Sequence, residues 1–110
     1  MKNLEQLRAA HALKWAPTIG KGAGDGEAKG VVKKIPALVI QCGLLSAMAF
    51  AKEKEAGYKD VFDAFIDYCD LLSARSLDEA IEELSSVESS DLRRITAEFM
   101  AYLGYLRRFV

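Results

Sequence analysis

The side chains whose types and spacing suggest chemistry are basic. Lys29 and Lys33 stand one helical turn apart, with Lys34 adjacent. Arg93 and Arg94 fall in the first turn of the last expected helix, where positive charge opposes the helix dipole at a cost of roughly a few tenths of a kcal/mol. An anionic partner or nearby acids would offset that cost, and the alternative is an ordinary solvated surface. The candidate anion-binding residues are Lys21, Lys29, Lys33, Lys34, Arg93 and Arg94.

A glycine-rich segment, GKGAGDGEAKG (20–30), surrounds the first of these lysines. A Walker loop needs Gly-Lys followed by Ser or Thr after a strand, whereas here Gly22 follows Lys21 and the preceding segment reads as helix. A GxGxxG spacing fails as well, because Glu27 stands where the third glycine belongs. We therefore interpret about 19–27 as a flexible surface loop.

No group of residues indicates an enzyme. His11 is the only histidine, and it shares a helical stripe with Leu4, Leu7 and Trp15. No partner for a histidine-activated nucleophile can be identified from the sequence. His11 is therefore expected to be a half-buried packing residue, and the chain is expected to be non-catalytic.

Metal and cofactor binding are not indicated either. The acidic residues Asp60, Asp63, Asp67 and Asp70 lie opposite an apolar stripe, so they read as a solvated face rather than as convergent ligands. Cys42 and Cys69 belong to no CxxC motif and have no cysteine or histidine at a metal-ligand spacing, and a zinc site needs about four ligands. They are expected to be reduced thiols, and no metal or cofactor is expected.

Charge is distributed unevenly along the 110 residues, although the net charge is only −1. The balance is +5 over residues 1–59, −9 over 60–91 and +3 over 92–110. If these segments form distinct faces, the molecule is strongly polarised. The 51% apolar content is ample for one core, so residues 1–110 are expected to form a single domain.

An uncharged run lies between Lys34 and Lys52. A membrane-spanning helix needs about 20 apolar residues and usually has Trp or Tyr at its ends. This run is shorter, contains Pro36 and Gln41, and lacks those aromatic residues. The N-terminal segment is too polar for a secretory signal. The run is therefore expected to be core, and the protein to be cytoplasmic without membrane contact.

Helical periodicity extends along the whole chain. The first helix is expected to close at Pro17. The next helix begins near residue 27 and meets Pro36, where it is expected to kink or restart. After that, the sequence is compatible either with a turn at 41–43 or with a helix that continues to Lys54.

Three more helices are expected. The first covers about 58–72. A short one covers 79–86 with Asp78 as its cap, and the last is capped by Ser89 or Ser90. The last helix carries an apolar seam, and the residues expected to be buried in the core are Phe65, Ile66, Leu103 and Leu106. The predicted fold is all-α: a single compact bundle of five to six helices with a buried apolar central helix or helix pair.

Three stretches resemble a known family, the small subunit of type III-B CRISPR effector (Cmr) complexes. The central one, KKIPALVIQCGLLSAMAFAKEK (33–54), has the family's proline, apolar segment, Gly-Leu pair and Phe followed by lysines. RAAHALKWA (8–16) is similar to the family's first helix and TAEFMAYLGYLRRF (96–109) to its last. The resemblance therefore covers the whole chain in order.

This resemblance implies an all-α, non-catalytic subunit that acts in antiviral defence. Copies would line up as a minor filament beside the RNA-cleaving RAMP backbone and Cas10-type subunits, next to the guide RNA–target RNA duplex. They would hold target RNA by contacts to its backbone that read no sequence, and the candidate basic residues would supply those contacts. The alternative hypothesis is a helical protein-interaction adaptor with no nucleic-acid contact.

Overall fold

The computed structural model describes residues 3–19, 27–54 and 57–110, with the side chains of all of these except 27–29. These residues contain six α-helices and no strand, which confirms the predicted all-α bundle. The predicted glycine-rich loop lies almost entirely outside them. The helices are α1 (Leu4–Trp15), α2 (Glu27–Cys42), α3 (Leu44–Lys54), α4 (Tyr58–Tyr68), α5 (Leu77–Ser86) and α6 (Ser89–Phe109), with a 3-10 turn, η1 (Ala16–Thr18), after α1.

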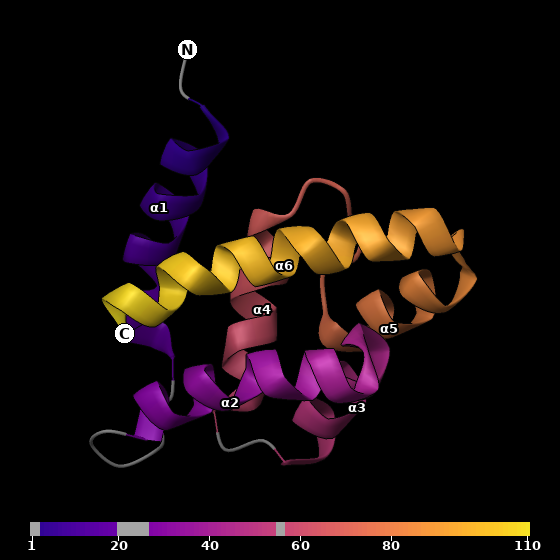
Figure 1. Cartoon of the computed structure of the whole chain (residues 1–110), viewed down its shortest axis with the longest axis horizontal. Coiled ribbons are helices and arrows are strands. Elements are labelled where there is room, and N and C mark those ends of the chain that lie inside the picture. The colour runs from indigo at the N-terminus through magenta and orange to yellow at the C-terminus, as the bar shows by residue number, and fades with distance from the viewer. Residues whose placement is uncertain (1–2, 20–26, 55–56) are drawn as a thin grey trace.

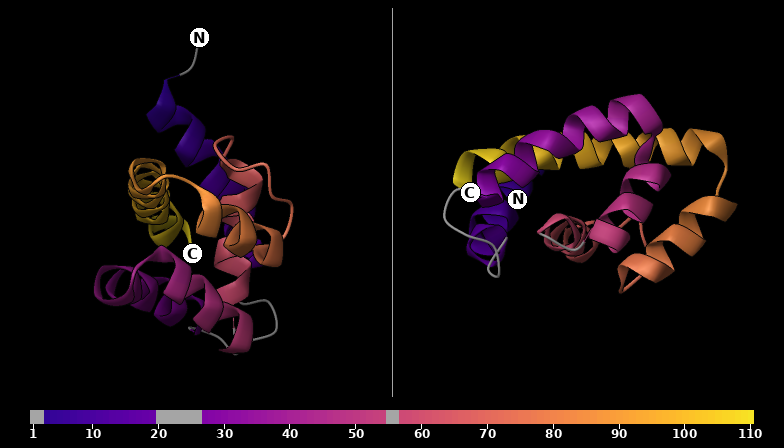
Figure 2. Two further views of the ribbon diagram at one scale, coloured as in Figure 1. Left: turned by 90° about the vertical axis from the view of Figure 1, so that its right-hand side faces the viewer. Right: turned by 90° about the horizontal axis from the view of Figure 1, so that it is seen from below.

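Helix α6 crosses the whole molecule, and the other helices are arranged around it (Figure 1). Helix α2 runs antiparallel to α6, so the start of α2 adjoins the end of α6. Figure 1 and the left view of Figure 2 show α2 and α3 along one edge. The start of α1 and the α4–α5 connection lie along the opposite edge. The molecule therefore has two well-separated edges.

The core is centred on α4, which packs against α1, α2, α3 and α5 and reaches α6 through aromatic contacts. Phe62 of α4 stacks on Phe99 of α6 with ring centroids 4.9 Å apart, and Phe65 meets the same ring edge-on. The predicted core residues Phe65, Ile66, Leu103 and Leu106 are all buried. The helical periodicity therefore identified the inward faces of α4 and α6 correctly.

The uncharged run forms a helix pair that is interrupted by glycine. Helix α2 continues through Pro36 and ends at Cys42, and Gly43 adopts a φ of 88°, a left-handed conformation that favours glycine. Val32, Ile35 and other residues of the pair are buried, whereas its outer face is exposed. No helix among the described residues is long and apolar enough to cross a membrane.

The helix caps differ from those predicted. Ser76, rather than Asp78, caps α5 by accepting a hydrogen bond from the backbone N–H of Glu79. Glu88 occupies the cap position of α6 without a side-chain bond, and Ser89 is already helical. Helix α4 also ends at Tyr68 rather than near residue 72. These ends depend on local backbone geometry, which periodicity does not determine.

Candidate nucleic-acid interface

The predicted basic residues lie on two helices. Lys33 and Lys34 are adjacent on α2, and both side chains are exposed. Lys29 also belongs to α2, but its side chain is outside the described residues, as is the whole of Lys21. Near the start of α6, Arg93 and Arg94 are both exposed. The described members of the set are therefore all accessible to a partner.

These residues do not form one continuous patch. Because α6 is antiparallel to α2, its start lies at the far end of the molecule from the start of α2 (Figure 1). The lysines lie midway along α2, whereas Arg93 and Arg94 lie near the start of α6. The fold therefore separates the predicted set into a lysine group and an arginine group.

A second arginine pair lies outside the predicted set. Arg107 and Arg108 occupy the last turn of α6, where the helix dipole favours them, so they were not counted as functional. Both side chains are exposed, and this end of α6 adjoins the start of α2. Arg107 and Arg108 therefore lie at the end of the molecule where α2 begins, and Lys33 and Lys34 lie farther along α2.

Several other basic side chains are neutralised within the described residues. Lys52 pairs with Asp78 at 2.6 Å, and Lys59 lies 3.9 Å from Asp63. Within the same residues, the exposed cations of α2 and α6 form no ion pair with a carboxylate. These cations are Lys33, Lys34, Arg93, Arg94, Arg107 and Arg108.

The unfavourable placement of Arg93 and Arg94 has a partial explanation inside the chain. The helix begins at Ser89, so Asp91 lies in its first turn, Arg93 and Arg94 follow in the second, and Glu88 is the residue at the cap. Negative charge at a helix start offsets the cost of positive charge there. The position of these arginines therefore does not by itself require an anionic ligand.

The histidine has partners that the sequence did not reveal. Its ring nitrogens lie 2.7 Å from the Tyr102 hydroxyl and 2.8 Å from an Asp67 carboxylate oxygen, and its ring stacks on Trp15. Because a carboxylate only accepts, in the neutral ring Nε2–H donates to Asp67 and Nδ1 accepts the Tyr102 proton. The predicted half-buried packing histidine is confirmed, and it links α1 to α4 and α6.

The Asp67–His11–Tyr102 series has the order of a nucleophilic relay, carboxylate to imidazole to hydroxyl. Its hydroxyl cannot meet a substrate, because Tyr102 is fully buried. Burial also raises the pKa of Tyr102, since the phenolate would lose its hydration. The arrangement is therefore suited to holding helices together rather than to attacking a bond.

A second polar cluster fastens α1 to the body. Arg8 donates two hydrogen bonds to Glu98, at 2.6 and 3.0 Å, and the Tyr68 hydroxyl donates to the same carboxylate at 3.3 Å. The Arg8 hydrogen bond lowers the pKa of Glu98 by stabilising its charged form. Leu4 and Leu7, which were placed on the same helical stripe as His11, are 49% exposed. Polar contacts thus hold this helix to a large degree.

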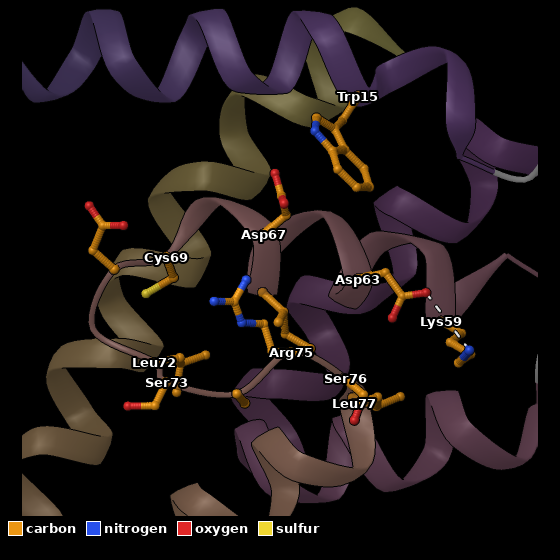
Figure 3. Close-up of a pocket in the computed structure, with 13 residues that line it drawn as sticks. Trp15, Lys59, Asp63, Asp67, Cys69, Leu72, Ser73, Arg75, Ser76 and Leu77 are labelled. Carbon is orange, nitrogen blue, oxygen red and sulfur yellow. Dashed lines mark ion pairs between the residues drawn. The ribbon is translucent and has the colours of Figure 1, made fainter.

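A cavity of about 730 Å³ lies between α1, α4 and the α4–α5 connection (Figure 3). Asp63 and Asp67 enter it from α4, Trp15 from α1 and Arg75 from the connection. Desolvation raises the pKa of Asp63. No group of three potential metal ligands occurs among the described residues. An acidic cavity of this kind does not suit RNA, so the basic helices remain the candidate interface.

Three comparisons with known proteins agree with this fold. Residues 4–110 match the family described as CRISPR-associated protein (Cas_Cmr5). The chain is 32% identical over 111 residues to the CRISPR system Cmr subunit Cmr5 of Thermus thermophilus, covering 99% of this chain and 94% of that protein. It is also similar to the crystal structure of a CRISPR-associated Cmr5 family protein from the same organism. That match has a TM-score of 0.81 at 29% identity, and it covers 98% and 95% of the two chains. The chain therefore belongs to the Cas_Cmr5 family of CRISPR-associated proteins.

Proposed function

We propose that this protein is a non-catalytic small subunit of a type III-B CRISPR RNA-guided effector complex, acting in the cytoplasm in antiviral defence. Copies stack as a minor filament beside the RAMP backbone and Cas10-type subunits. They help to hold target RNA at the guide–target duplex through backbone contacts that read no base. Family membership over the whole chain is the observation that carries this proposal.

The exposed cations of α2 and α6 support the RNA-binding part. Since they make no ion pair within the described residues, their charge is available to phosphates. Neutralising a phosphate releases counterions, which gives binding without sequence preference. The proposed contacts are Lys21, Lys29, Lys33, Lys34, Arg93 and Arg94, together with Arg107 and Arg108.

The non-catalytic part is supported by the His11 cluster. The one histidine of the chain is engaged by Asp67 and by Tyr102, whose hydroxyl is buried. It is therefore committed to helix packing, and no cofactor or metal is needed for the proposed role.

A second candidate function is a protein-interaction adaptor with no RNA contact. It is favoured by exposed apolar side chains on α1 and α2, and by the acids that already accompany Arg93 and Arg94. On this hypothesis, the subunit would affect which proteins assemble and leave RNA retention by the assembled complex unchanged.

Complexes reconstituted with and without this chain distinguish the two functions. We expect omission to lower the affinity for target RNA by the same factor for two unrelated guide–target pairs. We also expect the isolated chain to cleave no RNA, with or without divalent metal. Unchanged RNA affinity in a complex of altered protein content would favour the adaptor. RNA cleavage that survives purification and maps to this chain would overturn the non-catalytic role.

A further inference from the structure

An apolar groove of about 450 Å³ opens between the start of α1, the α4–α5 connection and α6. Leu4 and Leu7 line it from α1 and Leu71 from the connection, and all three are 41–49% exposed. A single exposed leucine on a surface is ordinary, but three around one hollow form a patch. Ala97 on α6 adds a small residue that keeps the groove open.

The polar cluster of α1 forms part of this groove and holds its walls together. Arg8, Glu98 and Tyr68 all line it, and their hydrogen bonds join α1, α4 and α6. Tyr68 also stacks on the buried Tyr102, with ring centroids 4.7 Å apart. The groove is therefore formed before any partner arrives, which lowers the entropic cost of binding.

An exposed apolar side chain that could fill this groove belongs to a helix on the opposite edge of the molecule. Ile40, in the last turn of α2, is 76% exposed, more than any other large apolar side chain among the described residues. Helix α2 lies along one edge, and the groove-forming start of α1 and the α4–α5 connection lie along the other (Figures 1 and 2). The exposed Ile40 therefore belongs to a helix on one edge of the molecule, and the apolar groove lies at the other edge.

The charges around the two features also match. The C-terminal end of a helix carries partial negative charge, and the last turn of α2 contains no basic residue. Arg94 lines the groove and would meet that end. Asp70 also lines the groove, and Lys33 offers it an opposite charge from the same face of α2, two turns before Ile40.

We infer that Ile40 of one copy enters the Leu4–Leu7–Leu71 groove of the next copy, with Arg94 against the end of the neighbour's α2. Because the two surfaces differ, the contact is heterologous, or head-to-tail, and such a contact can repeat from copy to copy as the proposed filament requires. The inference rests on the proposed stacking and specifies the surfaces that make it. It also gives Arg94 a protein partner, whereas Arg93 does not line the groove and remains free for RNA.

Cysteine cross-linking tests this contact directly. Ile40→Cys and Leu7→Cys are placed in one chain that also carries Cys42→Ser, because Cys42 is exposed. A short bis-maleimide is applied to the concentrated chain and to the reconstituted complex. We expect a ladder of covalent oligomers, since every copy carries both halves of the contact. Each single-cysteine variant should give no ladder, and an equal mixture of the two should give dimers.

Three controls make the result specific. The Cys42→Ser chain alone should stay uncross-linked, because Cys69 is buried. Adding Arg94→Glu to the two-cysteine chain should reduce the ladder several-fold, whereas adding the adjacent Arg93→Glu should leave it. The absence of a ladder in both preparations would overturn the inference. It would also be overturned if the Arg94→Glu variant gave an undiminished ladder but lost affinity for RNA. Target RNA affinity measured on the same complexes shows separately whether the proposed function fails.

Discussion

At the scale of single residues, polar side chains in a largely apolar bundle have structural rather than chemical roles. His11 satisfies both ring nitrogens within the fold, and Arg8 and Glu98 satisfy each other. Helix α1 buries only Ala12 completely, so these bonds carry much of its attachment. Each can be tested by removing one group while retaining the shape of the side chain.

Tyr102→Phe removes the hydroxyl that donates to His11 and leaves Nδ1 without that partner. We expect a loss of about 1–3 kcal/mol in the free energy of unfolding, measured by urea denaturation. Tyr105→Phe, on the same helix but partly exposed, is the matched control and should change stability little. Equal effects of the two substitutions would show that the His11 bond contributes nothing.

The Arg8–Glu98 pair predicts a pH dependence with a definite sign. Because the folded pKa of Glu98 is lowered, its contribution is present above the unfolded carboxyl pKa of about 4.3 and is lost as the pH falls through the folded value. Glu98→Gln should therefore be less stable than the unsubstituted protein at neutral pH, and this difference should shrink in acid. A difference that stays constant from pH 7 to pH 3 would contradict the pairing.

The aromatic centre of the core predicts the largest effect of a single substitution. Phe65 is fully buried and contacts the rings of Phe99, Tyr68 and Tyr102. Phe65→Ala should reduce the free energy of unfolding by about 3–5 kcal/mol, because a cavity replaces these contacts. A loss below about 1 kcal/mol in urea denaturation would mean that the core is not centred on α4.

At the scale of helices, the sequence predicts where helices occur better than how they end or which side they bury. The buried faces of α4 and α6 were predicted correctly, because apolar residues that recur every 3.6 positions indicate the face of a helix that packs against the core. Leu4 and Leu7 follow the same period but are exposed, since α1 extends beyond the body. The partners of His11 come from residues 56 and 91 positions away, a separation that periodicity cannot bridge.

The break between α2 and α3 can be tested with two glycines. Neither Gly43 nor Gly104 has an atom within 4 Å of where a Cβ would lie, so added methyl groups meet no steric clash. Gly43 has a φ of 88°, and Gly43→Ala should destabilise the protein by about 1–2 kcal/mol through backbone strain. Gly104→Ala, within helix α6, should stabilise it by about 0.5–1 kcal/mol. Thermal unfolding of both variants measures this contrast, and effects of the same sign would contradict it.

At the scale of the whole molecule, the fold converts a nearly neutral chain into a polarised one. The acidic segment 60–91 forms most of α4, the α4–α5 connection, α5 and the start of α6, and it supplies the carboxylates of the cavity of about 730 Å³. Six of the exposed cations that make no ion pair within the described residues lie instead on α2 and α6, and the other three, Lys14, Lys54 and Arg75, lie on other elements. Such separation allows one surface to meet RNA while others meet protein subunits.

The salt dependence of target RNA binding tests the central claim most directly. The variant Lys34→Ala/Arg108→Ala removes two cations from α2 and the end of α6, away from the groove. The control, Lys14→Ala/Arg75→Ala, removes two exposed cations from elsewhere. Filter binding on reconstituted complexes at several salt concentrations gives the log–log slope, with subunit content checked on a gel. Each phosphate contact contributes about 0.7 to this slope for a single strand, so we predict a slope that is flatter by about 1.4 for the first variant. The change should be the same for unrelated RNA sequences, and the control should show no change. An unchanged slope with full incorporation of the first variant would contradict the account.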